Sequence, residues 1–174
     1  MAFRDDLTKL PSRRALNELL PCLGSRYAIA MVDVDHFKRI NDVYGHDVGD
    51  EAIRQVAREV AAQTAITGRL GGEEFAMLLE GRDLAAAARI AEHLRTRISA
   101  MRVQTERQRL ALTCSFGVSE WEPGDTVDRL LKRADIALYS AKSSGRNRVV
   151  AFDTEVMAAI DCSSLSGRIR STGR

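Results

Sequence analysis

Two acidic residues stand where a short apolar segment of the chain ends. The segment 26–34 (RYAIAMVDV) has the pattern of a buried strand, and Asp33 and Asp35 lie at its end. Residues two apart share one face of a strand, so both carboxylates would face the same way if the strand continued through them. Mg²⁺ prefers such oxygen ligands, which makes this a candidate metal site. The same spacing equally fits acids that are solvated or that cap the following helix.

A second acidic site is predicted at the tip of a hairpin. Gly71 and Gly72 separate two strand-like segments, and Gly-Gly favours a tight turn because both positions can adopt positive φ. Glycines also let a ligand approach the backbone closely. Glu73 and Glu74 would point to opposite faces if extended, so that one of them could meet Asp33 across the sheet. A plain exposed hairpin with charged flanks is the alternative, and taken alone it is the commoner case.

The third candidate group is basic and lies near the predicted end of a long helix. Lys142 precedes Gly145, a typical helix-ending glycine, and Arg146 follows that glycine directly. An ammonium and a guanidinium at this place could grip phosphate groups. Cations also favour helix C-termini through the helix dipole, which is the ordinary alternative.

A fourth group follows the first acidic site and consists of Lys38, Asn41 and Asp50. Carboxylate and amide side chains can hydrogen-bond to the edge of a nucleobase. Taken singly, each of these residues is more often a solvated helix residue or a helix cap. No one of the four groups decides the chemistry by itself.

The segments that would position these groups alternate between strand-like and helix-like patterns. Short apolar runs between turn residues predict strands, and apolar stripes at helical spacing predict helices. The predicted strands are 26–34, 65–70, 74–80, 110–121 and 148–152, and the predicted helices are 36–43, 47–63, 83–101 and 126–142. One hairpin among interleaved helices indicates an α/β (α+β) fold with a mixed sheet that helices cover.

The composition is that of one globular domain. The chain has 174 residues, of which 45% are hydrophobic and 29% are charged. It lacks both a signal peptide and the roughly 18 consecutive apolar residues of a membrane helix, so we expect a cytoplasmic protein without direct membrane contact. A membrane anchor elsewhere in a longer parent protein stays open. The net charge of +2 is too small to indicate a nucleic-acid partner.

The cysteines and the C-terminal composition bear on the domain boundary. Cys22, Cys114 and Cys162 are odd in number and far apart, which argues against a disulfide framework. The end of the chain is rich in Ser, Gly and Arg and offers little to bury. We therefore expect one domain over 1–160 and a basic, disordered tail over 161–174.

Four motifs occur in the order found in one known family. The segment 33–50 carries DVDHFKRIND, YGH and GD, which resemble the D-x-D-x-F-K-x-x-N-D…GH…GD signature of GGDEF domains. The segment 69–75 (RLGGEEF) resembles the signature loop of that family in its GGEEF form. DDLTKLPSRR at 5–14 resembles the opening motif, with Ser12 where asparagine is usual, and 134–147 resembles the closing A-D-x-A-L-Y-x-A-K-x-x-G-R-N. The resemblance covers about 5–152.

The resemblance to diguanylate cyclases implies a fold and an activity. The fold would be a largely antiparallel central sheet flanked by helices, similar to the palm of polymerases and class III nucleotide cyclases. The activity would be the condensation of two GTP molecules into cyclic di-GMP and two pyrophosphates, by attack of a 3′-hydroxyl on the α-phosphate. Because each domain holds one GTP, turnover would need a homodimer. An upstream sensory domain in the parent protein is also implied.

The resemblance further implies roles for individual residues. Asp33, the backbone carbonyl of Val34 and Glu73 would bind Mg²⁺, with Mn²⁺ as an alternative and two ions in each site. Glu73 or Glu74 would help to deprotonate the 3′-hydroxyl, with Glu73 preferred, and Lys38 would stabilise the transition state. The remaining substrate-binding residues would be Asn41 and Asp50 at the guanine edge, the Phe37 backbone, Lys38, Lys142 and Arg146 at the phosphates, and His46, Gly71 and Gly72.

Two rival functions share this sequence pattern. One is an inactive module that senses GTP or cyclic di-GMP, but such members usually lose the metal aspartate or the signature glutamate, and both Asp33 and Glu73 are present. The other is a different nucleotidyl transferase, such as an adenylyl cyclase. Asp50 argues against it, since a carboxylate suits the N–H donors of guanine and repels the N1 acceptor of adenine.

One departure from the family concerns product feedback. Many members carry an R-x-x-D product-binding site whose aspartate is separated from the glycine pair by five residues. Ala62 and Ala65 stand at those two positions here. Alanine has neither the guanidinium fork nor the carboxylate that such a site needs, so the sequence predicts that this site is lost.

Overall fold

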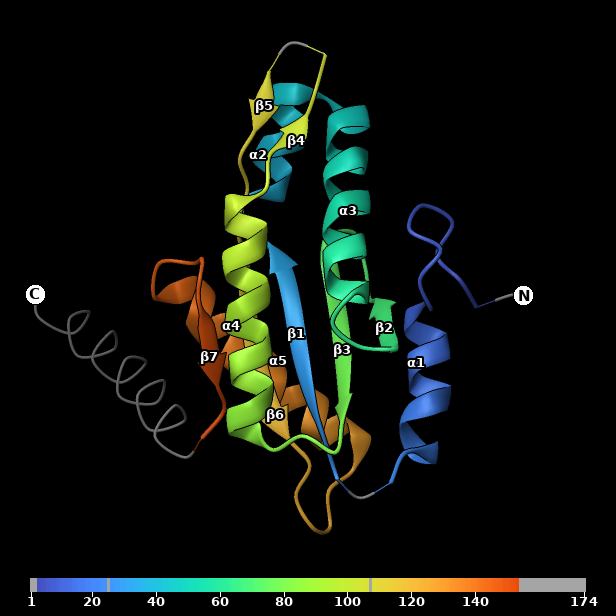
Figure 1. The fold of residues 1–174 in the computed structure, drawn as a ribbon. Helices are drawn as coiled ribbons and strands as arrows, with labels where there is room; N and C mark the ends of the chain where they lie inside the picture. The colour runs from blue at the N-terminus through green and yellow to red at the C-terminus, as the bar shows by residue number, and fades with distance from the viewer. Residues whose placement is uncertain (1–2, 25, 107, 154–174) are drawn as a thin grey trace, which may run out of the picture.

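The computed structural model describes residues 3–24, 26–106 and 108–153. Its centre is a five-stranded sheet in the order β2-β3-β1-β6-β7 (Figure 1). All pairs are antiparallel except β6 with β7, so the predicted mixed, largely antiparallel sheet is confirmed. The strands are β1 (Tyr27–Val34), β2 (Ile66–Arg69), β3 (Glu74–Glu80), β6 (Cys114–Glu120) and β7 (Val149–Ala151).

Helices cover both faces of this sheet and enclose two hydrophobic clusters. The helices α2 to α4 contribute to the cluster on one face, and α1 with α5 contributes to the cluster on the other. In Figure 1, α3 and α4 stand in front of the sheet while α5 lies behind it. The helices are α1 (Arg13–Leu19), α2 (Phe37–Tyr44), α3 (His46–Ala61), α4 (Leu84–Ala100) and α5 (Val127–Ser143), with the short 3-10 helix η1 (Leu20–Cys22) after α1.

The central strand β1 is buried along its whole length, because it pairs on both edges and is covered on both faces. Its side chains alternate between the two clusters. Tyr27, Ile29 and Met31 lie in the cluster of α1 and α5, whereas Ala28 and Ala30 lie in the other. This alternation puts Asp33, the next residue in the odd-numbered series, on the face of α1 and α5.

Side-chain and backbone caps mark where the two longest helices, α4 and α5, begin and end. The side chains of Asp83 and Thr126 accept from backbone N–H groups in the first turns of α4 and α5, so each predicted first residue is in fact an N-cap. The predicted stop at Gly145 is confirmed, since Gly145 has φ 114°. Arg146 N–H donates to Ala141 C=O at 3.0 Å and Gly145 N–H to Lys142 C=O at 3.4 Å, which is a Schellman motif.

Two sequence predictions need correction. The strand expected over 110–121 begins only at Cys114, and Leu110 belongs to a separate ribbon of β4 (Val103–Gln104) and β5 (Arg109–Leu110). The hairpin of β2 and β3 is present, but neither Gly71 nor Gly72 has positive φ. The turn therefore does not require glycine for its backbone conformation.

Within the described residues, no helix is long and apolar enough to cross a membrane. The expected tail 161–174, the boundary at 160 and Cys162 lie outside the described part of the chain. Cys114 is buried, and burial raises the pKa of its thiol far above the usual value. Its role as a small apolar core residue agrees with that environment.

Candidate active site

The carboxylates of the first two acidic groups meet where β1 and β3 adjoin. Asp33 lies directly opposite Glu74 in the antiparallel register of the two strands. Residues paired in this way project from the same face of a sheet. Glu73 is adjacent to the same point, because its backbone carbonyl accepts a hydrogen bond from the N–H of Val34 at 3.2 Å. The predicted meeting of a signature glutamate with Asp33 across the sheet is realised by Glu74.

The Asp33 carboxylate lies in an environment that disfavours its charge. It is only 6% exposed, and burial raises its pKa to about 6. The ammonium of Lys142, whose Nζ lies 2.8 Å from Oδ2, acts in the opposite direction. The negative charges of Glu73 and Glu74 raise the pKa further. Three carboxylates therefore share a small region in which one lysine contacts Asp33, and an additional cation would relieve their repulsion.

The donor set at this point fits a hard divalent cation. Mg²⁺ is commonly held by one or two carboxylates together with substrate phosphates, and a cage made wholly of protein ligands is unusual. The described residues contain no group of three or more His, Cys, Asp or Glu side chains gathered as a metal site. Asp33, the Val34 carbonyl and Glu73 could supply the protein oxygens, and Lys142 would have to release Asp33.

The basic residues at the end of α5 reach the same region. Lys142 lies in the last turn of α5 and contacts Asp33, so the first and third candidate groups form one site. Arg146 is the last residue of the Schellman motif, with φ 64°, and its side chain is exposed. The helix dipole accounts for a lysine at this helix end, but it does not require the lysine to reach a buried carboxylate on β1.

The fourth group lies on α2 and α3, which follow β1 directly. A Cβ atom on Gly49 would lie 1.8 Å from Asn41 Oδ1 and 3.3 Å from Phe37 Cζ, so Asn41 and Phe37 pack against the backbone of α3 beside Asp50. Gly49 is buried and Asp50 is half-buried. Because Gly49 has no side chain, the amide of Asn41 can lie against α3 next to Asp50.

Two members of the predicted site, Lys38 and His46, are exposed at the surface. Lys38 stands in the first turn of α2, and His46 is the first residue of α3. Their positions on consecutive helices leave both side chains accessible from the same end of the sheet as Asp33. Neither of them joins the contacts that hold Asp33, Glu74 and Lys142 together.

The family comparison matches this architecture. Residues 2–148 match the family model described as "Diguanylate cyclase, GGDEF domain". This chain belongs to the GGDEF domain family.

Characterised relatives of this GGDEF domain are longer proteins. The response regulator PleD of Caulobacter vibrioides is 41% identical over an aligned length of 163, and the match covers 86% of this chain and 36% of PleD. The diguanylate cyclase DgcP of Pseudomonas aeruginosa is 39% identical over an aligned length of 158, and the match covers 85% of this chain and 24% of DgcP. The chain thus spans about a quarter to a third of these two relatives.

Solved GGDEF structures superimpose on the whole architecture. The GGDEF domain of DgcB from Caulobacter crescentus, solved in complex with c-di-GMP, has a TM-score of 0.81 at 35% identity and covers 88% of this chain and 95% of that chain. The diguanylate cyclase SiaD of Pseudomonas aeruginosa, solved with its activator SiaC, has a TM-score of 0.82 at 39% identity, covering 86% of this chain and 62% of that chain.

The signature loop of this GGDEF domain is held by arginines that sequence reasoning did not single out. Arg69 binds both carboxylate oxygens of Asp5 at 2.9 and 3.0 Å and donates to the carbonyls of Gly71 and Gly72 at 3.1 and 2.7 Å. Arg13 donates to the Leu70 carbonyl. The only signal in the sequence was that these residues stand inside the opening and signature motifs.

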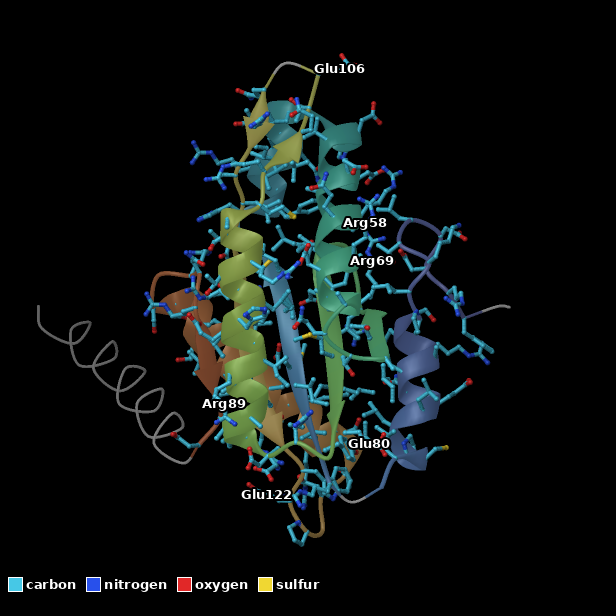
Figure 2. All side chains as sticks on the ribbon, in the orientation of Figure 1. Arg58, Arg69, Glu80, Arg89, Glu106 and Glu122 are labelled. Atoms are coloured by element: carbon cyan, nitrogen blue, oxygen red, sulfur yellow. The ribbon has the colours of Figure 1, made fainter. Side chains whose placement is uncertain are left out.

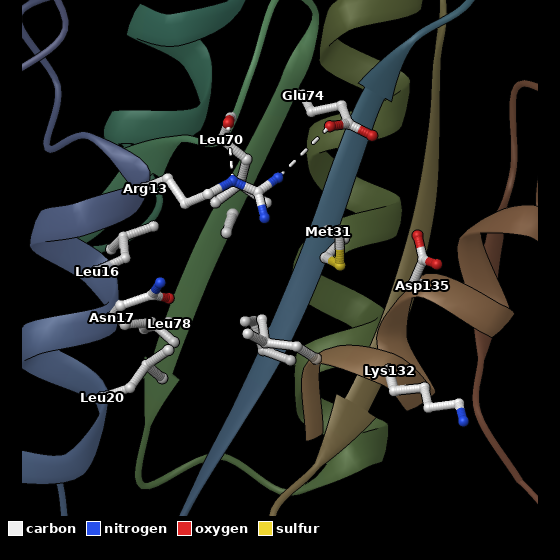
Figure 3. Close-up of a pocket in the computed structure, with 13 residues that line it drawn as sticks. Arg13, Leu16, Asn17, Leu20, Met31, Leu70, Glu74, Leu78, Lys132 and Asp135 are labelled. Atoms are coloured by element: carbon white, nitrogen blue, oxygen red, sulfur yellow. Dashed lines mark hydrogen bonds and ion pairs between the residues drawn. The ribbon is translucent and has the colours of Figure 1, made fainter. Parts of the chain in front are cut away.

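Arg13 also connects the loop to Glu74, one of the carboxylates of the candidate site. Figure 3 shows its side chain reaching from α1 toward Glu74, with 3.9 Å between Nη2 and Oε2. Glu74 stands at the rim of a cavity of about 390 Å³ between α1 and α5, which is floored by apolar residues of β1 and β3 such as Met31 and Leu78. The second signature glutamate is therefore oriented by an arginine and by the strand register.

Asp35 has a different environment from Asp33. The strand ends at Val34, so the condition for a shared face is not met. The Asp35 carboxylate is 4% exposed and accepts hydrogen bonds from the hydroxyls of Thr113 and Ser115, both at 2.6 Å, and from the N–H of Asn147 at 3.0 Å. These contacts make Asp35 a junction between β1, β6 and the turn after α5.

Proposed function

We propose that this GGDEF domain condenses two GTP molecules into cyclic di-GMP and two pyrophosphates. The observation that carries the proposal is the group of Asp33, Glu73 and Glu74 at the paired ends of β1 and β3, with Lys142 against Asp33. The diguanylate cyclases among its relatives support the same activity. The GGEEF form of the loop has a precedent in the "active GGEEF domain of a diguanylate cyclase from Vibrio cholerae", at 32% identity and a TM-score of 0.70 over 82% of this chain and 92% of that chain.

In each half-reaction, a ribose 3′-oxygen of one GTP attacks the α-phosphorus of the other. A phosphodiester bond forms, the bond from the α-phosphorus to the bridging oxygen breaks, and pyrophosphate leaves. The proton of the 3′-hydroxyl passes to a carboxylate, for which we prefer Glu73. Lys38 and Arg146 would offset the negative charge that develops on the phosphate oxygens. Lys142 would exchange Asp33 for a phosphate oxygen when GTP arrives.

The metal would be Mg²⁺, with Mn²⁺ as an alternative and two ions in each site. Asp33, the Val34 carbonyl and Glu73 would hold it, and a bound divalent cation lowers the pKa of the attacking hydroxyl and stabilises the phosphate charge. Glu74 would support this group through its place opposite Asp33. Neither Gly71 nor Gly72 has positive φ, and a Cβ atom added at either position would meet no backbone atom within 4 Å. Neither backbone conformation nor packing therefore requires glycine here, and the lack of side chains would serve the approach of a nucleotide.

Guanine recognition would fall to Asn41 and Asp50. The Asn41 amide can both donate and accept, and the Asp50 carboxylate suits the N1–H and N2–H₂ donors of guanine. The backbone N–H of Phe37, His46 and the first turn of α2 would lie along the nucleotide, because free N–H groups at a helix N-terminus favour phosphate. A sensory domain upstream in the parent protein would control how two such domains meet. The greater length of the relatives PleD and DgcP is consistent with a further domain of this kind.

The direct experiment incubates the protein with GTP and Mg²⁺ and separates the nucleotides by chromatography. Cyclic di-GMP and pyrophosphate in a ratio of one to two would support the cyclase. GTP binding without turnover, at protein concentrations that give a dimer, would instead favour the inactive sensor module. ATP converted as fast as GTP would favour the adenylyl cyclase alternative.

Specific activity is expected to rise with protein concentration. Each domain would hold one GTP, so only a pair of domains can complete the reaction, and dilution should separate them. The measurement is the initial rate per molecule from nanomolar to micromolar protein, with the oligomeric state followed by analytical ultracentrifugation. A flat specific activity in samples that sedimentation shows to be monomeric would contradict the two-domain mechanism.

Added cyclic di-GMP is expected not to inhibit the enzyme through the R-x-x-D position. Ala62 and Ala65 occupy that position, and the neighbouring arginines Arg58 and Arg69, labelled in Figure 2, are engaged elsewhere. Arg58 lies 3.8 Å from Glu51, and Arg69 binds Asp5. Product would bind only by competition with GTP. Initial rates at saturating GTP against added product test this, and strong non-competitive inhibition at low micromolar product would contradict it.

A further inference from the structure

The turn after α5 has a backbone that its own residues do not favour. Gly145, Arg146 and Asn147 have φ of 114°, 64° and 45°, so three consecutive residues lie in the left-handed region. Glycine adopts this region freely and asparagine tolerates it, but arginine has no such preference. Contacts from outside the turn must therefore hold Arg146 in place.

Two such contacts converge on Asn147, one on its backbone and one on its side chain. Its N–H donates to Asp35 Oδ2 at 3.0 Å, and its Oδ1 accepts from Arg95 Nη1 at 2.8 Å. Both anchors are themselves fixed. Asp35 is buried and accepts hydrogen bonds from the hydroxyls of Thr113 and Ser115. Arg95 donates to the carboxylate of Glu92, one turn earlier on α4, at 2.9 and 2.7 Å. Asn147 is thus clamped between the end of β1 and the middle of α4.

This clamp on Asn147 also restrains Arg146, the residue directly before it in the turn after α5. Arg146 is the last residue of the Schellman motif and directly precedes Asn147, so its own N–H and the N–H of the next residue are both held. Its guanidinium is exposed and makes no ion pair with the described residues. Lys142, one turn earlier, points to Asp33. An arginine with a fixed backbone and a free head group suits an anion that arrives from solution.

We propose that Asn147, clamped by Asp35 and Arg95, is a positioning residue that aims Arg146 at the triphosphate of the substrate. The inference rests on the proposed function, since it takes GTP as the substrate. It adds that phosphate affinity depends on a network whose members Asn147 and Arg95 do not themselves touch the nucleotide. Guanine recognition on α2 and α3 is separate from this network.

The test compares binding of a triphosphate with binding of a nucleoside. The probes are the α,β-methylene analogue of GTP with Mg²⁺, which cannot react because the bond that breaks is replaced, and guanosine, which lacks phosphates. Asn147→Gly removes Oδ1 but accepts positive φ, and Arg95→Ala removes the other partner of the same hydrogen bond. Arg97→Ala is the matched control, because Arg97 is a cation on the same helix that binds Glu59 at 2.8 Å and has no contact with the turn.

Both variants are expected to weaken binding of the analogue about tenfold, the usual effect of a lost charge-assisted hydrogen bond, and to leave guanosine affinity unchanged. The double variant Asn147→Gly/Arg95→Ala should lose no more than either single variant, because both break one interaction. Arg97→Ala should bind both probes like the wild type.

Two results would overturn the inference while leaving the proposed function intact. One is analogue affinity equal to that of the wild type in Asn147→Gly, which tests the clamp even if Arg95→Ala destabilises the domain. The other is an equal loss for the analogue and guanosine, which would show that the network supports the fold in general. A wild-type protein that binds no analogue at all would overturn the proposed function and this inference with it.

Discussion

Replacement of Glu73 by glutamine is expected to lower the rate of cyclic di-GMP formation at least about 1,000-fold while the domain stays folded. Glutamine keeps the shape of the side chain but loses the charge that would hold a divalent cation and accept the 3′-hydroxyl proton. The backbone carbonyl of Glu73, which accepts from Val34, is unaffected by the change. The measurement is kcat at saturating GTP and Mg²⁺, together with the midpoint of thermal unfolding.

Glu80→Gln provides the matched control for this variant. Glu80 is the last residue of β3, the strand that begins directly after Glu73; it lies opposite Tyr27 in the register and is exposed (Figure 2). Its replacement should leave both activity and unfolding unchanged. Glu73→Gln activity within about tenfold of the wild type at saturating Mg²⁺ would show that Glu73 neither holds the metal nor takes the proton. Glu74→Gln measured beside it would then test the other candidate base.

The fold could be predicted from the sequence where a pattern is local and long. The helices α4 and α5 have apolar stripes of several turns, and Asp83, Thr126 and Gly145 mark their limits by capping chemistry. The helix α1 was missed because its seven residues bury one side chain, Leu16, which gives no periodic stripe. The strand β4 was not predicted and Leu110 of β5 was merged with β6, because two-residue strands leave no alternation to detect.

The site was predicted as four separate groups, and their assembly depends on tertiary contacts. No spacing in the sequence indicates that Lys142 would reach Asp33, since this contact joins the end of the helix α5 to the end of the strand β1, which are far apart in the chain. The link from Arg69 to Asp5 is of the same kind, and so is the junction at Asp35. The conformation of Gly71 was predicted wrongly because Gly-Gly admits several turn types, and composition does not select one.

Asp50→Ala is expected to reduce the preference for GTP over ATP about 10- to 100-fold, which is the usual cost of a lost hydrogen bond to a charged group. The carboxylate favours the guanine N–H donors and opposes the adenine N1 acceptor. Its removal should therefore raise KM for GTP and narrow the difference in kcat/KM between GTP and ATP. The measurement is kcat/KM for each nucleotide. Asp47→Ala is a suitable control, because Asp47 is an exposed acid on the same helix. An unchanged GTP-to-ATP ratio would show that Asp50 does not read the base.

Gly49→Ala tests the same recognition without replacing either side chain that would perform it. The added methyl would lie 1.8 Å from Asn41 Oδ1, so the Asn41 amide must turn away from α3. The obstacle is the flexible end of a side chain, and alanine is a better helix former than glycine by about 1 kcal/mol, so the unfolding midpoint should not fall. KM for GTP should rise as it does in Asp50→Ala, whereas kcat at saturating GTP should fall less. Normal GTP affinity in a folded Gly49→Ala protein would place the guanine outside the contact of α2 with α3, and would remove Asn41 and Asp50 together from the site.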